Sequence, residues 1–310
     1  MNIRYICLCV ISVMILITGT VSAAQIGDIA GELKISQWLT GEPVSIEKGK
    51  NIYVVEFWAT WCPHCRDCIP ILSEIQKKFG NKGVVVVGVT TEAREDVEPF
   101  VKGKKDEIAY AIGIDNAEQT YKAYMEAFGT DAIPNAFIVS RDGRILWFGH
   151  PADALEKALE EILAGTYDLE KAKKETLAKM RIEKAERLIP VYQHLTTNTD
   201  EEVLIKAVSS LILYYAKDNA GFLEAFAQLI LMYPEISRWG KDTAMKSIKT
   251  AIELSKEQEP SILATYALAL FEDGKLGEAI QYQKKAIALC GDEEKKAEYE
   301  ERLKEYQNYQ

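Results

Sequence analysis

The sequence has no excess of positive charge, few histidines and few cysteines. Its 310 residues include 37 Lys and Arg against 47 Asp and Glu, a net charge of -10, and 3 histidines. Such a chain offers no basic face to nucleic acid or anionic lipid, so neither is expected as a partner. Of its 6 cysteines, 4 follow residue 24. These are too few for a disulfide framework, and the close pair among them points to redox chemistry.

Long apolar runs are also scarce, and one of them lies at the N-terminus. There an apolar stretch over residues 5–17 follows Arg4 and precedes small residues at 22–24. This pattern is typical of a secretory signal peptide, so we predict one over residues 1–24, cleaved after one of its last two residues. We therefore expect an exported protein of the bacterial periplasm. The alternative is an uncleaved anchor, which would place the protein at the membrane.

Residues 25–165 alternate short apolar runs with amphipathic segments. The runs 51–59 and 83–90 are continuous and rich in β-branched residues, as in buried strands. Between them, residues 64–80 have a helical pattern that is predicted to end at Gly80 with a left-handed cap. The expected fold of this part is an α/β sheet covered by helices on both faces.

The second half lacks strand-like runs. Residues 166–219 are interpreted as a charged helical linker region, and residues 220–310 as a small all-helical domain. From Pro260 on, small and apolar residues recur in a pattern that resembles the tetratricopeptide repeat (TPR). The residues that carry this pattern are Tyr266, Ala267, Leu270, Gly274, Ala279, Ala286 and Leu289.

A weaker copy of the same pattern precedes this repeat. Ala244 and Ala251 each lie 35 residues before Ala279 and Ala286. The sequence therefore predicts a TPR-like helical domain that could bind a protein partner. For the part before Gly221, an undifferentiated helical bundle is an equally good interpretation.

The stretch "VVEFWATWCPHCRDCIP", residues 54–70, holds three of the cysteines. Cys62-x-x-Cys65 stands where a strand-like run meets a helical one, which is the arrangement of a redox-active pair. At a helix N-terminus, free backbone N–H groups and the helix dipole would stabilise a Cys62 thiolate. With His64 and Cys68 nearby, zinc is the alternative, but a structural site would need a second ligand pair at a distance. We therefore expect no metal.

Two features together resemble the thioredoxin superfamily. One is Trp61-Cys62-Pro63-His64-Cys65 at the end of "FWATWCPHC", and the other is Ile133-Pro134 before a strand and an Asp-Gly hairpin. An added strand and helix over about residues 108–128 resemble, more specifically, the exported TlpA/ResA-like branch. The resemblance covers roughly residues 26–165.

This resemblance implies thiol-disulfide exchange with client proteins and with a redox partner, without a cofactor other than the Cys62–Cys65 disulfide. Cys62 would attack or be attacked, and Cys65 would resolve the mixed disulfide. Pro134 would be a cis proline lying against the pair, and the backbone of Ile133 would pair with the client. An ordinary trans proline opening an edge strand is the alternative.

Glu56 is the one charge within the strand-like run before the motif. Burial of a carboxylate there would be costly unless it were neutral or paired, so burial should raise its pKa and make it a proton store. The resemblance implies that it exchanges a proton with Cys65. The alternative is a position at the edge of the sheet, with the side chain in water.

The residues around the two cysteines are expected to tune them. Trp61, Pro63 and His64 flank the pair, and His64 gives the motif Cys-Pro-His-Cys that is also found in DsbA, a strong oxidant. We therefore expect a disulfide more oxidising than is usual for TlpA-like reductants. Cys68 and Cys290 are expected to be packing residues, and for Cys68 the alternative is a redox role in which it intercepts an over-oxidised or mixed-disulfide Cys65.

Three functions remain open on the sequence. The first is an exported thiol-disulfide oxidoreductase that acts on protein thiols. The second is a TPR-mediated binding protein whose redox domain serves one client. The third, a thiol peroxidase, is disfavoured because such enzymes use a lone peroxidatic cysteine in a threonine-containing loop. Of the two remaining histidines, His150 is expected to cap locally and His194 to be structural.

Overall fold

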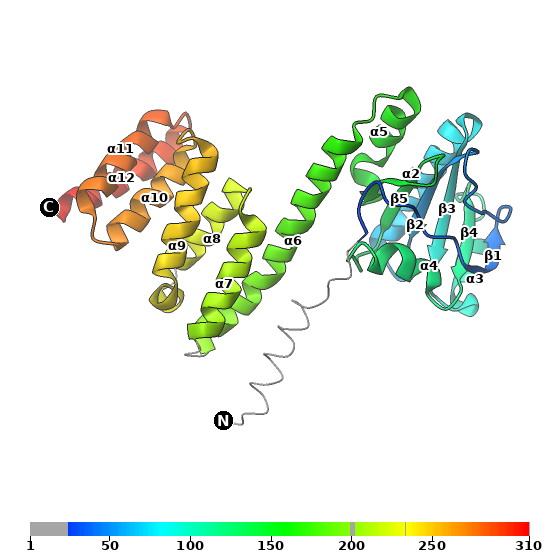
Figure 1. Cartoon of the computed structure of the whole chain (residues 1–310), viewed down its shortest axis with the longest axis horizontal. Helices are drawn as coiled ribbons and strands as arrows, with labels where there is room; N and C mark the ends of the chain where they lie inside the picture. The colour runs from blue at the N-terminus through cyan, green and yellow to red at the C-terminus, as the bar shows by residue number, and fades with distance from the viewer. Residues whose placement is uncertain (1–23, 199–201, 233, 310) are drawn as a thin grey trace. The chain divides into compact units, whose positions relative to one another are not determined.

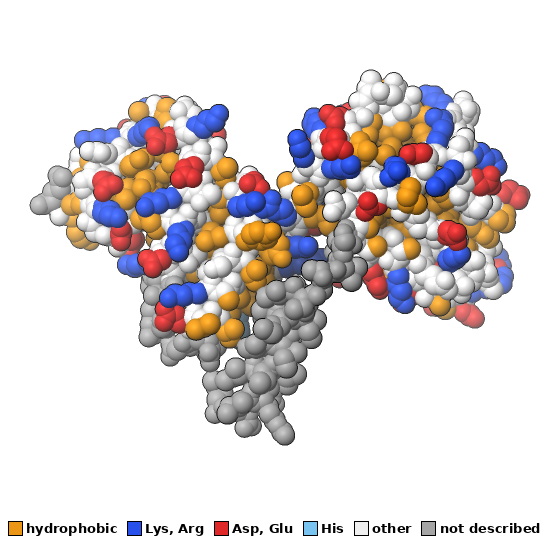
Figure 2. Space-filling model, viewed as in Figure 1, with side chains coloured by type: hydrophobic (Ala, Val, Ile, Leu, Met, Phe, Trp, Pro, Cys, Tyr) orange, Lys and Arg blue, Asp and Glu red, His pale blue; other side chains and the backbone are white. Residues whose placement is uncertain are grey.

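The computed structural model describes residues 24–198, 202–232 and 234–309, and the predicted signal peptide lies outside them except for Ala24. The chain divides into two compact units between Lys174 and Glu175 (Figure 1). In the described part, no helix is long and apolar enough to cross a membrane. On the face seen in Figure 2, side chains of both charge signs are interspersed.

The first unit contains a six-stranded mixed sheet with the strand order β1-β4-β3-β2-β5-β6. Strands β2, β3 and β4 run parallel, whereas β1, β5 and β6 join by antiparallel pairing. The predicted α/β fold is therefore confirmed. The strands are β1 (Ile35–Thr40), β2 (Ile52–Phe57), β3 (Val84–Thr90), β4 (Ala111–Asp115), β5 (Asn135–Val139) and β6 (Ile145–Gly149).

Helices cover both faces of this sheet, as predicted. On one face, Val54 packs in a cluster with residues of α2, α3 and α5. On the other face, Val55 packs with Tyr124 and Met125 of a π-helical turn. The elements are α2 (Pro63–Phe79), the 3-10 turn η1 (Gly80–Lys82), α3 (Arg94–Gly103), α4 (Gln119–Tyr121), the π turn η2 (Lys122–Glu126) and α5 (Pro151–Ala164).

The predicted left-handed cap at Gly80 is wrong. Gly80 keeps right-handed helical angles, with φ -57° and ψ -41°, because the chain tightens into η1 instead of stopping. The left-handed residue is Gly83, with φ 83°, and its N–H donates to the Gly80 carbonyl over 3.1 Å. Gly83 thus supplies the positive φ that a side chain would resist, three residues later than predicted.

The second unit is all-helical, as predicted. Its elements are α6 (Leu169–Asn198), which begins before the division, α7 (Glu202–Ala216), α8 (Ala220–Met232), α9 (Pro234–Ser255), α10 (Pro260–Glu272), α11 (Leu276–Leu289) and α12 (Glu293–Asn308). One apolar core runs from Ala185 to Tyr306. Residues 166–219, predicted to be a charged linker, contribute to this core from Ala185 on, because the apolar residues of α7 recur at helical spacing.

The small residues of the repeat pattern lie in this core. Ala244, Ala251, Ala267, Ala279 and Ala286 are all fully buried. The turn between α10 and α11 contains Gly274, whose φ is 76°. Leu289 differs from the prediction, because it is 42% exposed at the end of α11.

Candidate active site

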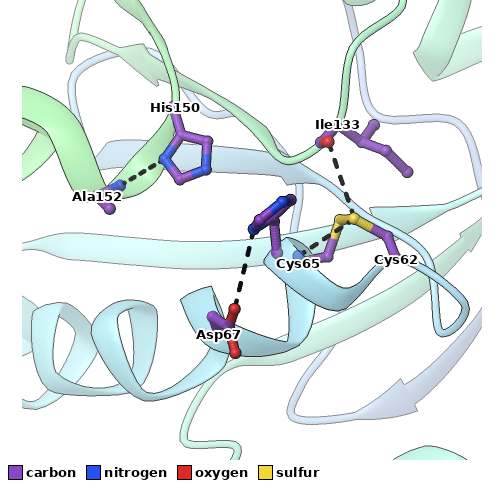
Figure 3. A network of polar contacts seen from close by, with 7 residues as sticks. Cys62, Cys65, Asp67, Ile133, His150 and Ala152 are labelled. Carbon is purple, nitrogen blue, oxygen red and sulfur yellow. Dashed lines mark hydrogen bonds and ion pairs between the residues drawn. A yellow bond between two sulfur atoms is a disulfide. The ribbon is translucent and has the colours of Figure 1, made fainter.

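Cys62 and Cys65 form a disulfide at the N-terminus of α2, with their Cα atoms 5.3 Å apart. Cys62 is the N-cap, and its Sγ accepts a hydrogen bond from the Cys65 N–H over 3.2 Å (Figure 3). Pro63 follows at the first helical position, where a missing N–H costs nothing. The sulfur of Cys62 therefore lies where the helix dipole favours negative charge.

The loop before β5 lies against this disulfide. The Ile133–Pro134 peptide is cis, as the resemblance implied. The Cys62 Sγ lies 3.8 Å from the Ile133 carbonyl oxygen, as Figure 3 shows. The topology thus brings together residues 71 positions apart in the chain.

Glu56 lies in the centre of the sheet, and the alternative of an edge position is excluded. Strand β2 is flanked by β3 and β5, and Glu56 is 1% exposed. Alternation along β2 places it on the same face as Val54 and Trp58, which pack with Cys65. Among the described residues, its Oε2 has no hydrogen-bond partner. Burial raises the pKa of Glu56 well above its usual range, which favours the protonated form of the carboxyl group.

The surroundings of Glu56 include residues that the sequence did not indicate. Its partner in β3 is Gly88, and a Cβ added there would meet Trp58 Nε1 at 3.1 Å and a ring carbon of Tyr110 at 3.2 Å. Two aromatic rings and the Ile112 side chain, whose Cδ1 would lie 2.8 Å from that Cβ, therefore occupy the space that a β3 side chain would fill. Burial, and then the charge of Glu56, raises the pKa of Tyr110.

Cys68 is a buried free thiol. Burial raises its pKa to about 11, and the nearby charge of Glu56 adds to the effect. Because the thiolate is the reactive form, this agrees with a packing role. Cys290 ends α11 and is a half-buried free thiol beside the helical core.

The rim of the site carries exposed side chains. Trp61 is 69% exposed. The His64 Nδ1 lies 4.0 Å from Asp67 Oδ2, with both side chains 80% exposed. In the described part of the chain, no group of three or more His, Cys, Asp or Glu side chains is placed to hold a metal ion.

The two other histidines make local contacts. His150 caps α5, because its Nδ1 accepts a hydrogen bond from the Ala152 N–H over 3.2 Å (Figure 3). This confirms the predicted local cap. His194 is exposed on α6, where its carbonyl accepts from Asn198 Nδ2 over 3.1 Å.

Glu92 is a residue near the site that the sequence reasoning missed. Its carboxylate binds Thr60, two residues before Cys62, from a loop 32 positions away. An exposed-looking glutamate in "TTEARED" gives no local signal of such a contact. The contact follows from the parallel pairing of β2 and β3, which brings the loops after both strands to one edge of the sheet.

Residues 26–148 match the model of the AhpC/TSA family. The match covers most of the α/β unit and none of the helical unit. One relative of this chain is protein FixW from Rhizobium leguminosarum, 26% identical over 154 residues, which are 47% of this chain and 69% of that protein. The thiol-disulfide oxidoreductase ResA from Bacillus thuringiensis is 27% identical over 111 residues, or 35% of this chain and 60% of ResA. The chain thus spans less than two thirds of this ResA.

Solved structures also resemble part of this chain. One is the thioredoxin domain of a thiol-disulfide oxidoreductase from Bacteroides vulgatus, with 25% identity and a TM-score of 0.39 over 45% of this chain and 99% of that one. Another is a thiol:disulfide interchange protein from Bacteroides sp., with 22% identity and a TM-score of 0.40 over 47% of this chain and 95% of that one.

Proposed function

We propose that this protein is an exported thiol-disulfide oxidoreductase that exchanges disulfides with client proteins through Cys62 and Cys65. The observation that carries the proposal is the Cys62–Cys65 disulfide at the N-terminus of α2, beside the Ile133 carbonyl. The sequence relationship to ResA supports it. The helix N-terminus makes Cys62 the better leaving thiolate, so Cys62 is the sulfur that we assign to the client.

In the oxidising direction, a client thiolate attacks the Cys62 sulfur. The Cys62–Cys65 bond breaks, a mixed disulfide forms, and Cys65 leaves with the electron pair. Glu56, whose protonated form is favoured by burial, delivers a proton to the Cys65 thiolate. A second client thiolate then attacks the client sulfur and releases Cys62, so that two electrons have passed to the protein. Reduction of a client follows the same steps in reverse.

A trapping experiment tests this function. With Cys65→Ala, the resolving thiol is lost, so the reduced variant, whose Cys62 thiolate attacks and breaks a disulfide of the client, should accumulate a mixed disulfide that is visible on a non-reducing gel and reduced by dithiothreitol. The matched controls are Cys62→Ala/Cys65→Ala, which should trap nothing, and Cys65→Ala/Cys68→Ala, which should trap as well as Cys65→Ala. If no client is trapped in cells although the variant is folded and exported, the proposed function is wrong.

For the second unit we propose a TPR-like domain that recruits the client. The burial of Ala244, Ala251, Ala279 and Ala286, two pairs 35 residues apart, supports a repeated helix pair. Deletion of residues 170–310 should then abolish reaction with that client and leave exchange with unrelated thiols unchanged. Equal loss with both kinds of substrate would contradict client selection by this unit.

Export is the remaining part of the proposal. It rests on the charged, apolar and small segments of residues 1–24. A chain expressed in a bacterium should appear in the periplasmic fraction with a new N-terminus at residue 24 or 25. A full-length chain retained in the membrane fraction would instead support the uncleaved anchor.

A further inference from the structure

A glutamate outside the Cys-x-x-Cys motif holds the turn that leads to Cys62. Glu92 follows β3, and both of its carboxylate oxygens are engaged by that turn. The Thr60 N–H donates to Oε2 over 2.6 Å, and the Thr60 hydroxyl donates to Oε1 over 2.7 Å. The hydroxyl of Thr90, at the end of β3, also donates to Oε2 over 3.2 Å. Short hydrogen bonds to a carboxylate are among the stronger ones in proteins.

The turn between Ala59 and Cys62 has modest restraints of its own. The Cys62 N–H donates to the Ala59 carbonyl over 3.3 Å, which closes the turn. Trp61 is 69% exposed, so burial fixes little of it. Just before the turn, the Trp58 N–H donates to the Val89 carbonyl over 3.1 Å. The contact between Glu92 and Thr60 therefore continues the pairing of the β2 and β3 segments two residues beyond Trp58, to a position just before Cys62.

We propose that Glu92 is a positioning residue for thiol-disulfide exchange, which fixes the turn so that Cys62 and Trp61 meet a client in one orientation. This inference rests on the proposed function. Exchange requires the attacking sulfur to approach along the axis of the disulfide bond that breaks. A turn free to shift would hold Cys62 in that geometry for a smaller part of the time, and small misplacements of reacting groups slow reactions strongly.

Two effects of Glu92 can be separated by substitution. Its negative charge alone would disfavour a nearby thiolate, so removing the charge alone would favour the Cys62 thiolate. Thr60→Val keeps the shape of the residue, its N–H bond and the Glu92 charge, but it removes the hydroxyl bond. Glu92→Gln removes the charge and leaves one acceptor oxygen for two Thr60 donors. If positioning is what matters, both variants slow exchange, whereas a charge effect would spare Thr60→Val.

The experiment uses the full chain in its oxidised form and a synthetic peptide with two cysteines as electron donor. The rate of exchange is followed by stopped-flow tryptophan fluorescence across pH, and the reduction potential is measured against glutathione. Amide hydrogen exchange at Thr60 reports the turn directly. The controls are Thr60→Ser, which keeps both bonds, and Glu98→Gln, which removes a partly exposed carboxylate that is paired with Arg94 and Lys102 on α3.

We expect Glu92→Gln and Thr60→Val to slow exchange by about tenfold at every pH, with the two controls within about twofold of the wild type. The Thr60 amide should lose protection from hydrogen exchange in Glu92→Gln and keep it in Glu98→Gln. If the wild type exchanges disulfides and both variants match it, the inference is wrong and the proposed function stands. If the wild type exchanges none, the proposed function itself fails.

Discussion

The two units differ in how they hydrogen-bond an inward-facing glutamate. In the helical unit, Glu224 of α8 is half-buried, and its oxygens accept hydrogen bonds from Ser261 over 3.2 Å and Thr265 over 3.3 Å. In the α/β unit, Glu56 is deeper, and its Oε2 has no hydrogen-bond partner among the described residues. Burial raises the pKa of both acids, but at Glu224 the two hydroxyl groups oppose the rise.

This difference gives Glu224 a structural role and leaves Glu56 available for proton transfer. Hydrogen bonds to Glu224 tie α8 to α10 and stabilise its charged form. Glu56 has apolar and aromatic neighbours, so its neutral form is favoured and its proton is available to a thiolate that forms nearby. The cysteines follow the same division, because the α/β unit holds the disulfide and the helical unit holds only Cys290 among its described residues.

The largest expected effect on the exchange rate comes from replacing the cysteines of the two units. Cys62→Ala should abolish exchange with a dithiol peptide, because the sulfur at the helix N-terminus is lost. Cys290→Ala, in the helical unit, should leave the rate unchanged. The measurement is the rate of peptide oxidation by the oxidised protein. Residual exchange in Cys62→Ala above the uncatalysed rate would assign the chemistry to another thiol.

The next effect concerns the two glutamates. Glu56→Gln removes the proton store without changing the size of the side chain, so release of Cys65 should slow by about 10²-fold near neutral pH. Glu224→Gln is the matched control and should leave the rate unchanged. Single-turnover kinetics with the dithiol peptide measure both. Equal rates in wild type and Glu56→Gln would show that Cys65 obtains its proton elsewhere.

A smaller effect is the pH dependence of stability. Folded Glu56 keeps its proton where the unfolded chain loses it, above the ordinary pKa of 4.5, so the free energy of unfolding should fall as pH rises above that value. The slope for one such group is about 1.4 kcal/mol per pH unit, until the raised pKa of the folded state is reached. Glu56→Gln should flatten this slope. Amide exchange of β2 residues between about pH 5 and 8 measures it.

The sequence predicted the centre of the site well because its signals are local. Cys62, Cys65 and Glu56 lie within ten residues, and a charge in a β-branched run is visible without a structure. The first strand, β1, was not predicted, because it is a half-exposed edge strand whose partner, β4, is distant in sequence. Glu92 was missed for the same reason, since its contact with Thr60 depends on which strands are neighbours.

Boundaries were predicted less well than elements. Gly80 and Gly83 both suit the end of α2, and the choice depends on how the chain tightens after Phe79. The extent of the helical core depends on whether the apolar face of α7 packs against other helices. The charged segment before α7 favoured a linker and so hid this packing from the sequence analysis. In both cases tertiary packing decides between local alternatives of similar propensity.

The most direct test of the account is the state of the cysteines at equilibrium with glutathione. Peptide mass spectrometry of the protein, poised across a series of glutathione potentials, should show Cys62 and Cys65 gaining and losing one disulfide together, with Cys68 and Cys290 free throughout. The midpoint should lie at a more oxidising potential than that of thioredoxin, because His64 between the two cysteines is expected to favour the Cys62 thiolate and therefore the reduced form. A midpoint at the potential of thioredoxin would contradict the predicted oxidising character. Failure of Cys62 and Cys65 to interconvert as a pair would contradict the account as a whole.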